Sequence, residues 1–233
     1  MAAALIAAEN SGLRVSVVDD NPYLGGQIWR NELGRIKSKK ADRLLEKIYS
    51  GRIDILNSIT IFDRLDSNCL LGDATNGLFQ IRFDNLIIAA GARERFLPFP
   101  NWTLPNVYGA GGLQALVKSG FSVENKRVVV SGTGPLLLAV AEYLSSKGAT
   151  LLMILEQASR QKILGFGAGL WRHPGKLIEA LKLKSKLSGI AYLPGAYIAS
   201  AEGDEKLDAV NLVQRGSSRR VECDLLACGY HLI

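Results

Sequence analysis

The chain contains an imperfect internal repeat whose second copy is complete and whose first copy lacks its opening segment. The second copy, residues 128–156, reads as an apolar strand, a glycine turn, a helix and a second strand that ends on Glu156. Residues 1–19 match only its later part, a helix-like segment and a strand that ends on Asp19. Aligning the two acidic strand ends leads us to expect the matching first strand and glycine turn upstream of Met1. Strands linked through a helix in this way predict a parallel α/β sheet.

The glycine turn of the second copy is suited to binding a phosphate. Without a side chain, Gly132 and Gly134 let backbone N–H groups approach a ligand closely, and the helix that follows adds partial positive charge. Leu137 stands where a third glycine or an alanine usually permits tight packing. Glu156 is placed to accept a hydrogen bond from a ribose hydroxyl, and its charge favours NAD over NADP. A core of the same fold that holds no nucleotide remains the alternative.

The first half offers a similar but incomplete set of residues. Asp19 is the analogous ribose acceptor, with Asp20 as the alternative if the register shifts by one residue. Gly25 and Gly26 would let the chain pass close to a pyrophosphate or a flavin, and a simple surface turn is the alternative.

Both halves close with an apolar run that ends in glycine, residues 86–91 and residues 224–229. Such runs are typical of a parallel strand buried on both faces. Between the shared opening and the shared closing run, each half carries a basic helical stretch and short alternating strands; the second also has a glycine-rich loop at residues 165–169. We therefore predict two α/β domains, residues 1–105 and residues 106–233, the second including the connecting segment.

Composition narrows the class of protein. No apolar run approaches about 18 residues without glycine, proline or charge, so we expect no membrane span. The net charge of +6 lies in short clusters without interleaved aromatics, which indicates a solvated surface rather than a nucleic-acid interface. The three cysteines form no Cys-x-x-Cys pair and the two histidines are isolated, so neither a redox pair nor a metal site is expected. A reducing cytoplasm fits this cysteine usage.

Three stretches carry a specific resemblance: DDNPYLGGQIWR, LIIAAGARERFLPFP and VVVSGTGPLLLAVAEYL. They resemble the FAD/NAD(P)-binding pyridine nucleotide-disulfide oxidoreductase superfamily. Within it they are most similar to flavin-containing subunits of heteromeric amine and amino-acid dehydrogenases, of the opine oxidase, proline dehydrogenase and hydrogen cyanide synthase types. The resemblance implies two Rossmann-like, three-layer domains, the first lacking its initial strand and glycine loop. It also implies an amine or amino-acid substrate and a partner that is a second dehydrogenase subunit.

The resemblance also implies cofactor contacts. FAD would be bound by Asp19 at the adenosine ribose, by the flavin-side residues Gly25, Gly26 and Gln27, and by Ala90 and Gly91. A second nucleotide, NAD or another adenine nucleotide, would be bound by Gly132, Gly134, Glu156 and Gly229. The implied reaction is oxidation of a C–N bond with hydride transfer to the flavin. No catalytic residue is identified. Thiol–disulfide exchange is not expected, because no cysteine pair follows the Gly25-Gly26 turn.

Two other functions stay open at this point. One is a nucleotide-binding subunit without catalysis, and the other is an NAD(P)H-dependent flavin reductase. A buried central strand contributes about 1.5–3 kcal/mol per large apolar side chain. We therefore expect the first half, without that strand, to be poorly stable and to bind FAD weakly or not at all. The chain as a whole is expected to be inactive alone. The second half is expected to fold by itself.

Overall fold

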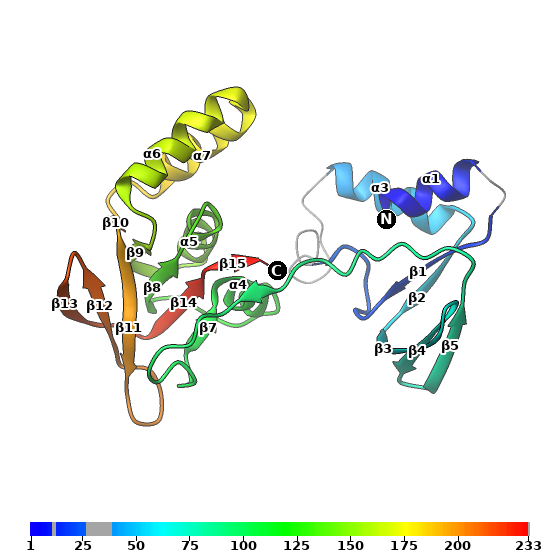
Figure 1. The fold of residues 1–233 in the computed structure, drawn as a ribbon, viewed down its shortest axis with the longest axis horizontal. Helices are drawn as coiled ribbons and strands as arrows, with labels where there is room; N and C mark the ends of the chain where they lie inside the picture. The colour runs from blue at the N-terminus through cyan, green and yellow to red at the C-terminus, as the bar shows by residue number, and fades with distance from the viewer. Residues whose placement is uncertain (11–12, 27–38, 233) are drawn as a thin grey trace. The chain divides into compact units, whose positions relative to one another are not determined.

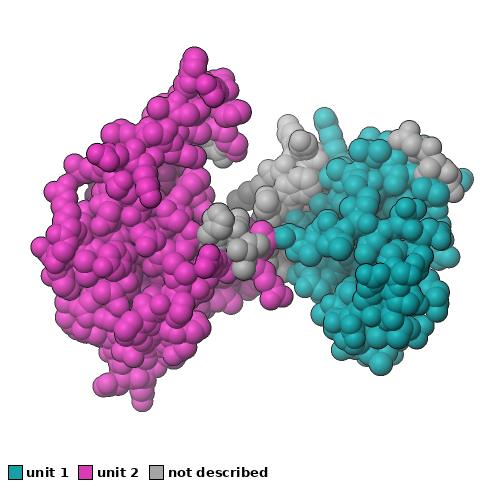
Figure 2. All heavy atoms as spheres, viewed as in Figure 1, with its two compact units in different colours: residues 1–91 teal, residues 92–233 magenta. Residues whose placement is uncertain are grey.

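The fold is known from a computed structural model that describes residues 1–10, 13–26 and 39–232. The chain forms two compact units, Met1–Gly91 and Ala92–Ile233, coloured separately in Figure 2. The predicted boundary after residue 105 therefore differs from the structural one. Phe96 and Phe99 pack against a core cluster of unit 2, and the Ala201 N–H donates to the Pro100 carbonyl at 3.0 Å. These contacts assign residues 92–105 to unit 2.

Unit 1 opens with a helix and a parallel strand pair. Its first elements are α1 (Ala2–Asn10), β1 (Val15–Asp19), α3 (Lys39–Ser50) and β2 (Ile53–Asn57). Strands β1 and β2 pair in parallel, so the predicted strand that ends on Asp19 is confirmed. The two helices lie along this pair (Figure 1). They enclose a small core, whose buried side chains in the described part of the unit are Leu5, Leu24, Leu45, Ile48 and Ile53.

The predicted alternating strands of unit 1 form a separate antiparallel sheet. It contains β3 (Ile59–Asp66), β4 (Cys69–Ala74) and β5 (Gly77–Arg82) in that order. Cys69 is fully buried in β4, whereas most side chains of β3 and β5 are exposed.

The predicted buried strand at residues 86–91 is wrong. This segment has no regular secondary structure and its side chains are exposed; Ile87 and Ile88 are 69% and 80% exposed. A strand forms only where a neighbouring strand satisfies its backbone hydrogen bonds. Among the described residues of unit 1, no strand lies beside this segment to supply them. An apolar run is therefore not sufficient to make a strand here.

Unit 2 is built on a five-stranded parallel sheet with the order β10-β9-β8-β14-β7. The elements of this unit run in the order β6 (Glu94–Arg95), β7 (Val107–Gly109), α4 (Ala110–Lys118), β8 (Arg127–Gly132), α5 (Leu136–Ser146), β9 (Thr150–Glu156), α6 (Arg160–Gly169), η2 (Leu170–Arg172), α7 (Pro174–Lys186), β10 (Ala191–Pro194), β11 (Ala196–Glu202), β12 (Ala209–Gln214), β13 (Ser217–Glu222), β14 (Leu225–Gly229) and β15 (His231–Leu232).

The parallel sheet of unit 2 is the middle of three layers. Val128 and Val130 of β8 face a core shared with α4 and α5, whereas Val129 between them faces a core shared with β11 and β12. Period-two alternation of side chains along a strand produces this division. Leu137 is fully buried on the helix side. The bulky residue at the third glycine position is thus accommodated as a core side chain.

The predicted glycine-rich loop at residues 165–169 is also wrong, because these residues belong to α6. The Ser159 hydroxyl caps the helix by accepting a hydrogen bond from the Lys162 N–H at 3.4 Å. A good N-terminal cap offsets part of the helix-breaking tendency of internal glycines.

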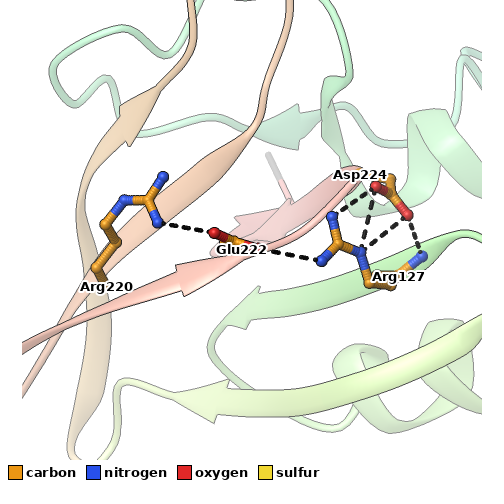
Figure 3. Close-up of polar contacts among 4 residues, drawn as sticks. All are labelled: Arg127, Arg220, Glu222 and Asp224. Atoms are coloured by element: carbon orange, nitrogen blue, oxygen red, sulfur yellow. Dashed lines mark hydrogen bonds and ion pairs between the residues drawn. The ribbon is translucent and has the colours of Figure 1, made fainter.

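A network of charged side chains joins the β-layers of unit 2 (Figure 3). Arg127, at the start of β8, donates from its backbone N–H to Asp224 at 2.7 Å and pairs with the same carboxylate through Nη2 at 3.0 Å. Glu222 lies 3.6 Å from Arg127 and 3.2 Å from Arg220. The hydrogen bond from Arg127 lowers the pKa of Asp224 below its ordinary value. These pairs tie β13 and β14 to β8.

Candidate functional site

The glycine turn of unit 2 lies between β8 and α5, at the carboxyl end of the parallel sheet. Gly132 and Gly134 both have positive φ, 146° and 92°. A Cβ on Gly132 would lie 1.8 Å from the Gly229 carbonyl oxygen, so this glycine is required for the close approach of β14. A Cβ on Gly134 would meet nothing within 4 Å. The structure therefore brings Gly132 and Gly229 together and leaves open space beside Gly134.

Glu156 ends β9 beside this turn, with only 3% of its surface exposed. Its Oε1 accepts hydrogen bonds from the Thr133 hydroxyl at 2.7 Å and the Ala158 N–H at 2.9 Å. Its Oε2 accepts from the Gly134 N–H at 2.9 Å and, at a longer 3.4 Å, from the Tyr192 hydroxyl. Burial and the nearby Glu156 charge together raise the pKa of Tyr192. The carboxylate is thus enclosed by donors of its own domain.

A second carboxylate, which the sequence analysis did not single out, lies at the same edge of the sheet. Glu94 is half-buried and accepts from the Gly111 N–H, at 2.9 Å through Oε2, at the start of α4. Burial raises the pKa of Glu94, and hydrogen bonds from the helix N-terminus oppose this rise. A Cβ on Gly109 would lie 2.6 Å from this carboxylate, and one on Gly229 would lie 2.9 Å from it. In the sequence, the glycines that surround Glu94 in the structure were the available sign that this residue is packed closely. Its position between two arginines, however, is typical of an ordinary surface charge.

In unit 1, Asp19 and Asp20 lie at the carboxyl end of β1. The Oδ1 of Asp19 accepts from both the backbone N–H and the side-chain amide of Asn21, each at 2.9 Å. Asp20 is exposed and also accepts from the Asn21 amide. The two acidic strand ends, Asp19 and Glu156, therefore both lie at the tips of parallel strands.

Three of the remaining predicted residues of unit 1, Gly25, Ala90 and Gly91, lie outside helices and strands. Gly25, Gly26 and Gly91 have φ angles of 130°, 55° and 77°, and a Cβ on Gly26 or Gly91 would meet nothing within 4 Å. Ala90 is exposed. Gln27 lies outside the described residues.

The two units differ in how well they fit a nucleotide. Unit 1 has a carboxylate at a strand tip and open glycines, which fit contacts to FAD. Unit 2 has the complete strand–turn–helix geometry for a phosphate, yet the Gly134 N–H and the Thr133 hydroxyl are already bonded to Glu156. Over the described part of the chain, no cluster of three or more His, Cys, Asp or Glu residues could hold a metal ion.

The three cysteines are free and buried. Burial raises the pKa of the Cys223 thiol to about 12 and also raises the pKa of the Cys228 thiol. A buried thiol that stays protonated at neutral pH is a poor nucleophile for disulfide exchange.

The parallel sheet, its covering helices and its glycine turn define a Rossmann-like α/β protein, the fold typical of FAD- and NAD-binding domains. The family described as pyridine nucleotide-disulphide oxidoreductase matches residues 1–230, and the chain belongs to this family.

Curated relatives narrow the comparison. Hydrogen cyanide synthase subunit HcnB of Pseudomonas protegens is 31% identical to the chain. The alignment covers the whole chain and 54% of the length of HcnB. An opine oxidase subunit of Agrobacterium tumefaciens is 31% identical over 78% of the chain and 39% of its own length. The chain thus spans about half the length, or less, of these relatives.

Solved structures agree on the fold. L-proline dehydrogenase from P. horikoshii superposes with a TM-score of 0.66 at 15% identity, covering 99% of the chain and 39% of the dehydrogenase. Thioredoxin reductase from T. acidophilum superposes with a TM-score of 0.69 at 17% identity. The superposition covers 99% of the chain and 73% of the reductase. No helix among the described residues has the length and apolar character needed to cross a membrane.

Proposed function

We propose that this chain forms the nucleotide-binding part of an FAD-dependent oxidoreductase that oxidises the C–N bond of an amino acid, an opine or a related amine. The observation that carries the proposal is the family match over residues 1–230 together with 31% identity to HcnB and to the opine oxidase subunit. When bound, FAD would supply the hydride acceptor. Disulfide reduction is disfavoured, because the chain has no cysteine pair and its thiols are buried.

The cofactor contacts belong to the same proposal. Asp19 would accept from the adenosine ribose of FAD, with Gly25, Gly26 and Gly91 allowing close backbone approach. Unit 2 would offer its glycine turn to NAD or another adenine nucleotide. The backbone geometry at each of these positions supports such contacts, since every one of these glycines has a positive φ.

A partner and a compartment also belong to the proposal. HcnB and its opine oxidase counterpart are, by their names, subunits of larger enzymes, which supports a partner that is a second dehydrogenase subunit. The three free cysteines support a reducing compartment, the cytoplasm.

Anaerobic reduction of the flavin tests the function. The protein is expressed from its complete coding sequence, loaded with FAD, and mixed with proline or an opine while the flavin absorbance is followed. Bleaching by one of these amines, with none on addition of NADH, is the expected result. Bleaching by NADH alone would instead identify a flavin reductase. Binding of a nucleotide with no bleaching by either reductant would identify a non-catalytic subunit.

A further inference from the structure

A helical arm projects from unit 2 and exposes large apolar side chains. The arm, residues 160–186, consists of α6, η2 and α7, and Figure 1 shows it extending beyond the parallel sheet. Every residue of α6 and η2 is at least partly exposed. Five large apolar side chains of the arm are between 53% and 72% exposed: Leu164, Phe166, Trp171, Ile178 and Leu181. Exposed apolar surface that gathers on one element indicates a binding site for another molecule.

Helix α7 presents apolar side chains on two opposite sides. Its inner side packs on unit 2, where Leu183 is half-buried and Leu187, the C-terminal cap, is buried in the core that also contains α5 side chains. At about 100° per residue, Ile178 and Leu181 lie on the opposite side of the helix. A helix that covers a protein core normally has a polar outer side. The apolar outer side of α7 therefore indicates that a second surface covers it.

The arm also carries the whole net charge of the chain. It contains seven basic residues and one acidic residue, Glu179; subtracting these from the 28 basic and 22 acidic residues of the chain leaves 21 of each. The basic residues are Arg160, Lys162, Arg172, Lys176, Lys182, Lys184 and Lys186. The remainder of the chain therefore has no acidic excess to attract the arm of a second copy, and two arms that faced each other would repel. Charge complementarity calls for a different molecule with an acidic surface.

The arrangement of the apolar and basic side chains favours a protein over a lipid surface. Lys182 and Lys184 are exposed and lie on either side of the outer apolar pair of α7. A protein interface has this pattern, an apolar centre with a polar rim. A helix that lies on a membrane instead collects its apolar side chains on a single face. On α6, Leu164 and Phe166 are two positions apart and so point about 160° away from each other.

We propose that the helical arm binds a partner subunit whose docking surface combines apolar side chains with an excess of acidic residues. The inference rests on the proposed function, which includes a second dehydrogenase subunit, and it adds where on this chain that subunit binds. Burial of the exposed apolar side chains would supply most of the affinity. Pairing of acidic residues with the basic side chains would orient the partner and speed its association.

Photocrosslinking on the complete protein locates the partner. The photoreactive amino acid benzoylphenylalanine replaces Leu181 in the protein expressed from its complete coding sequence in its native host. We expect one predominant cross-link, to a dehydrogenase subunit, within a peptide rich in Asp and Glu. The control position is Leu78 of β5, which is 77% exposed in unit 1 and should give no cross-link to that subunit.

Two double variants test the contact in the purified complex. Lys182→Glu/Lys184→Glu reverses the charge beside the apolar pair, and Ile178→Ser/Leu181→Ser removes the pair itself. We expect each to weaken the affinity for the cross-linked subunit roughly tenfold or more in titration calorimetry. Lys206→Glu, in an exposed turn outside the arm, should leave this affinity unchanged. Because all four replaced side chains of the arm are exposed, circular dichroism should show folded variants. Added salt should weaken binding by the wild type more than binding by Lys182→Glu/Lys184→Glu.

Three results would overturn the inference. Cross-links from the Leu181 position only to other parts of the same chain would mean that the protein covers its own arm. Binding to vesicles of phosphatidylcholine and phosphatidylserine that Lys182→Glu/Lys184→Glu abolishes, with subunit affinity unchanged, would assign the arm to a membrane surface. Unchanged subunit affinity in both double variants would exclude the arm as the docking surface. Amine-dependent bleaching of the flavin is measured separately, so bleaching without a subunit on the arm would leave the proposed function standing.

Discussion

At the residue scale, the most constrained position is Gly132. Its φ of 146° is one that side chains rarely permit, and its Cα lies against the backbone of Gly229. The Thr133 N–H then donates to the Gly229 carbonyl at 2.8 Å, which joins the turn to β14. A glycine that sequence reasoning reserved for a ligand is therefore also needed for the packing of two strands.

Substituting Gly132 by alanine is expected to destabilise unit 2 strongly. The new Cβ would overlap the Gly229 carbonyl oxygen, and a backbone shift of this kind costs about 1–3 kcal/mol or more. The matched control is Gly165→Ala in α6, where the added Cβ meets nothing within 4 Å. That change should be neutral or stabilising by up to about 1 kcal/mol. Urea denaturation compares the two; equal stabilities would refute the packing role of Gly132.

Asp224 should make stability depend on acid pH. Its folded pKa is depressed by the hydrogen bond from Arg127, so its contribution is present above the unfolded pKa, near 4, and is lost as pH falls through the lower folded value. Asp224→Asn should therefore lower the melting temperature by a few degrees near neutral pH, with a smaller difference at about pH 3. Thermal melts of the wild type and of Asp224→Asn between about pH 3 and neutral pH measure this difference in melting temperature. A difference that does not shrink in acid would rule out this ionic contribution.

At the scale of elements, two similar apolar runs have different structures. Residues 225–229 form β14 because β8 and β7 pair with it on either side. Residues 86–91 are equally apolar but have no neighbouring strand in the described part of unit 1, and they remain exposed. The availability of a partner, rather than composition, decides which run becomes a strand.

Amide hydrogen exchange compares these two runs within one sample. Backbone amides of residues 225–229 should exchange slowly, because they lie inside the parallel sheet. Amides of residues 86–91 should exchange within the shortest labelling time. Mass spectrometry of peptides that cover each run measures both. Strong protection of residues 86–91 would mean that another segment pairs with them in solution.

At the scale of the whole molecule, the two units have cores of very different size. Among the described residues, the buried cluster of unit 1 contains five side chains, whereas unit 2 has two larger clusters on opposite faces of its sheet. Stability follows buried apolar area, so the units should not be equally stable.

Heating should therefore unfold the chain in two steps, unit 1 first. Calorimetry should show a low-temperature transition for unit 1, and a chain of residues 92–233 alone should keep the higher one. Mild proteolysis should leave a fragment that begins near Ala92. A single transition, lost in the shorter chain, would show that the units unfold together.

The sequence by itself determined the units of local order. Continuous apolar runs predicted β8, β9 and β14, and the turn at Gly132 and Gly134 was expected between β8 and α5, because these features depend on neighbouring residues. Residues 86–91 and α6 were mispredicted, since a strand needs a partner and a capped helix can tolerate glycines. Only the tertiary structure decided what Glu156 and Glu94 contact. Their hydrogen bonds join residues far apart in the chain, and no local pattern encodes which donors a carboxylate will meet once it is buried.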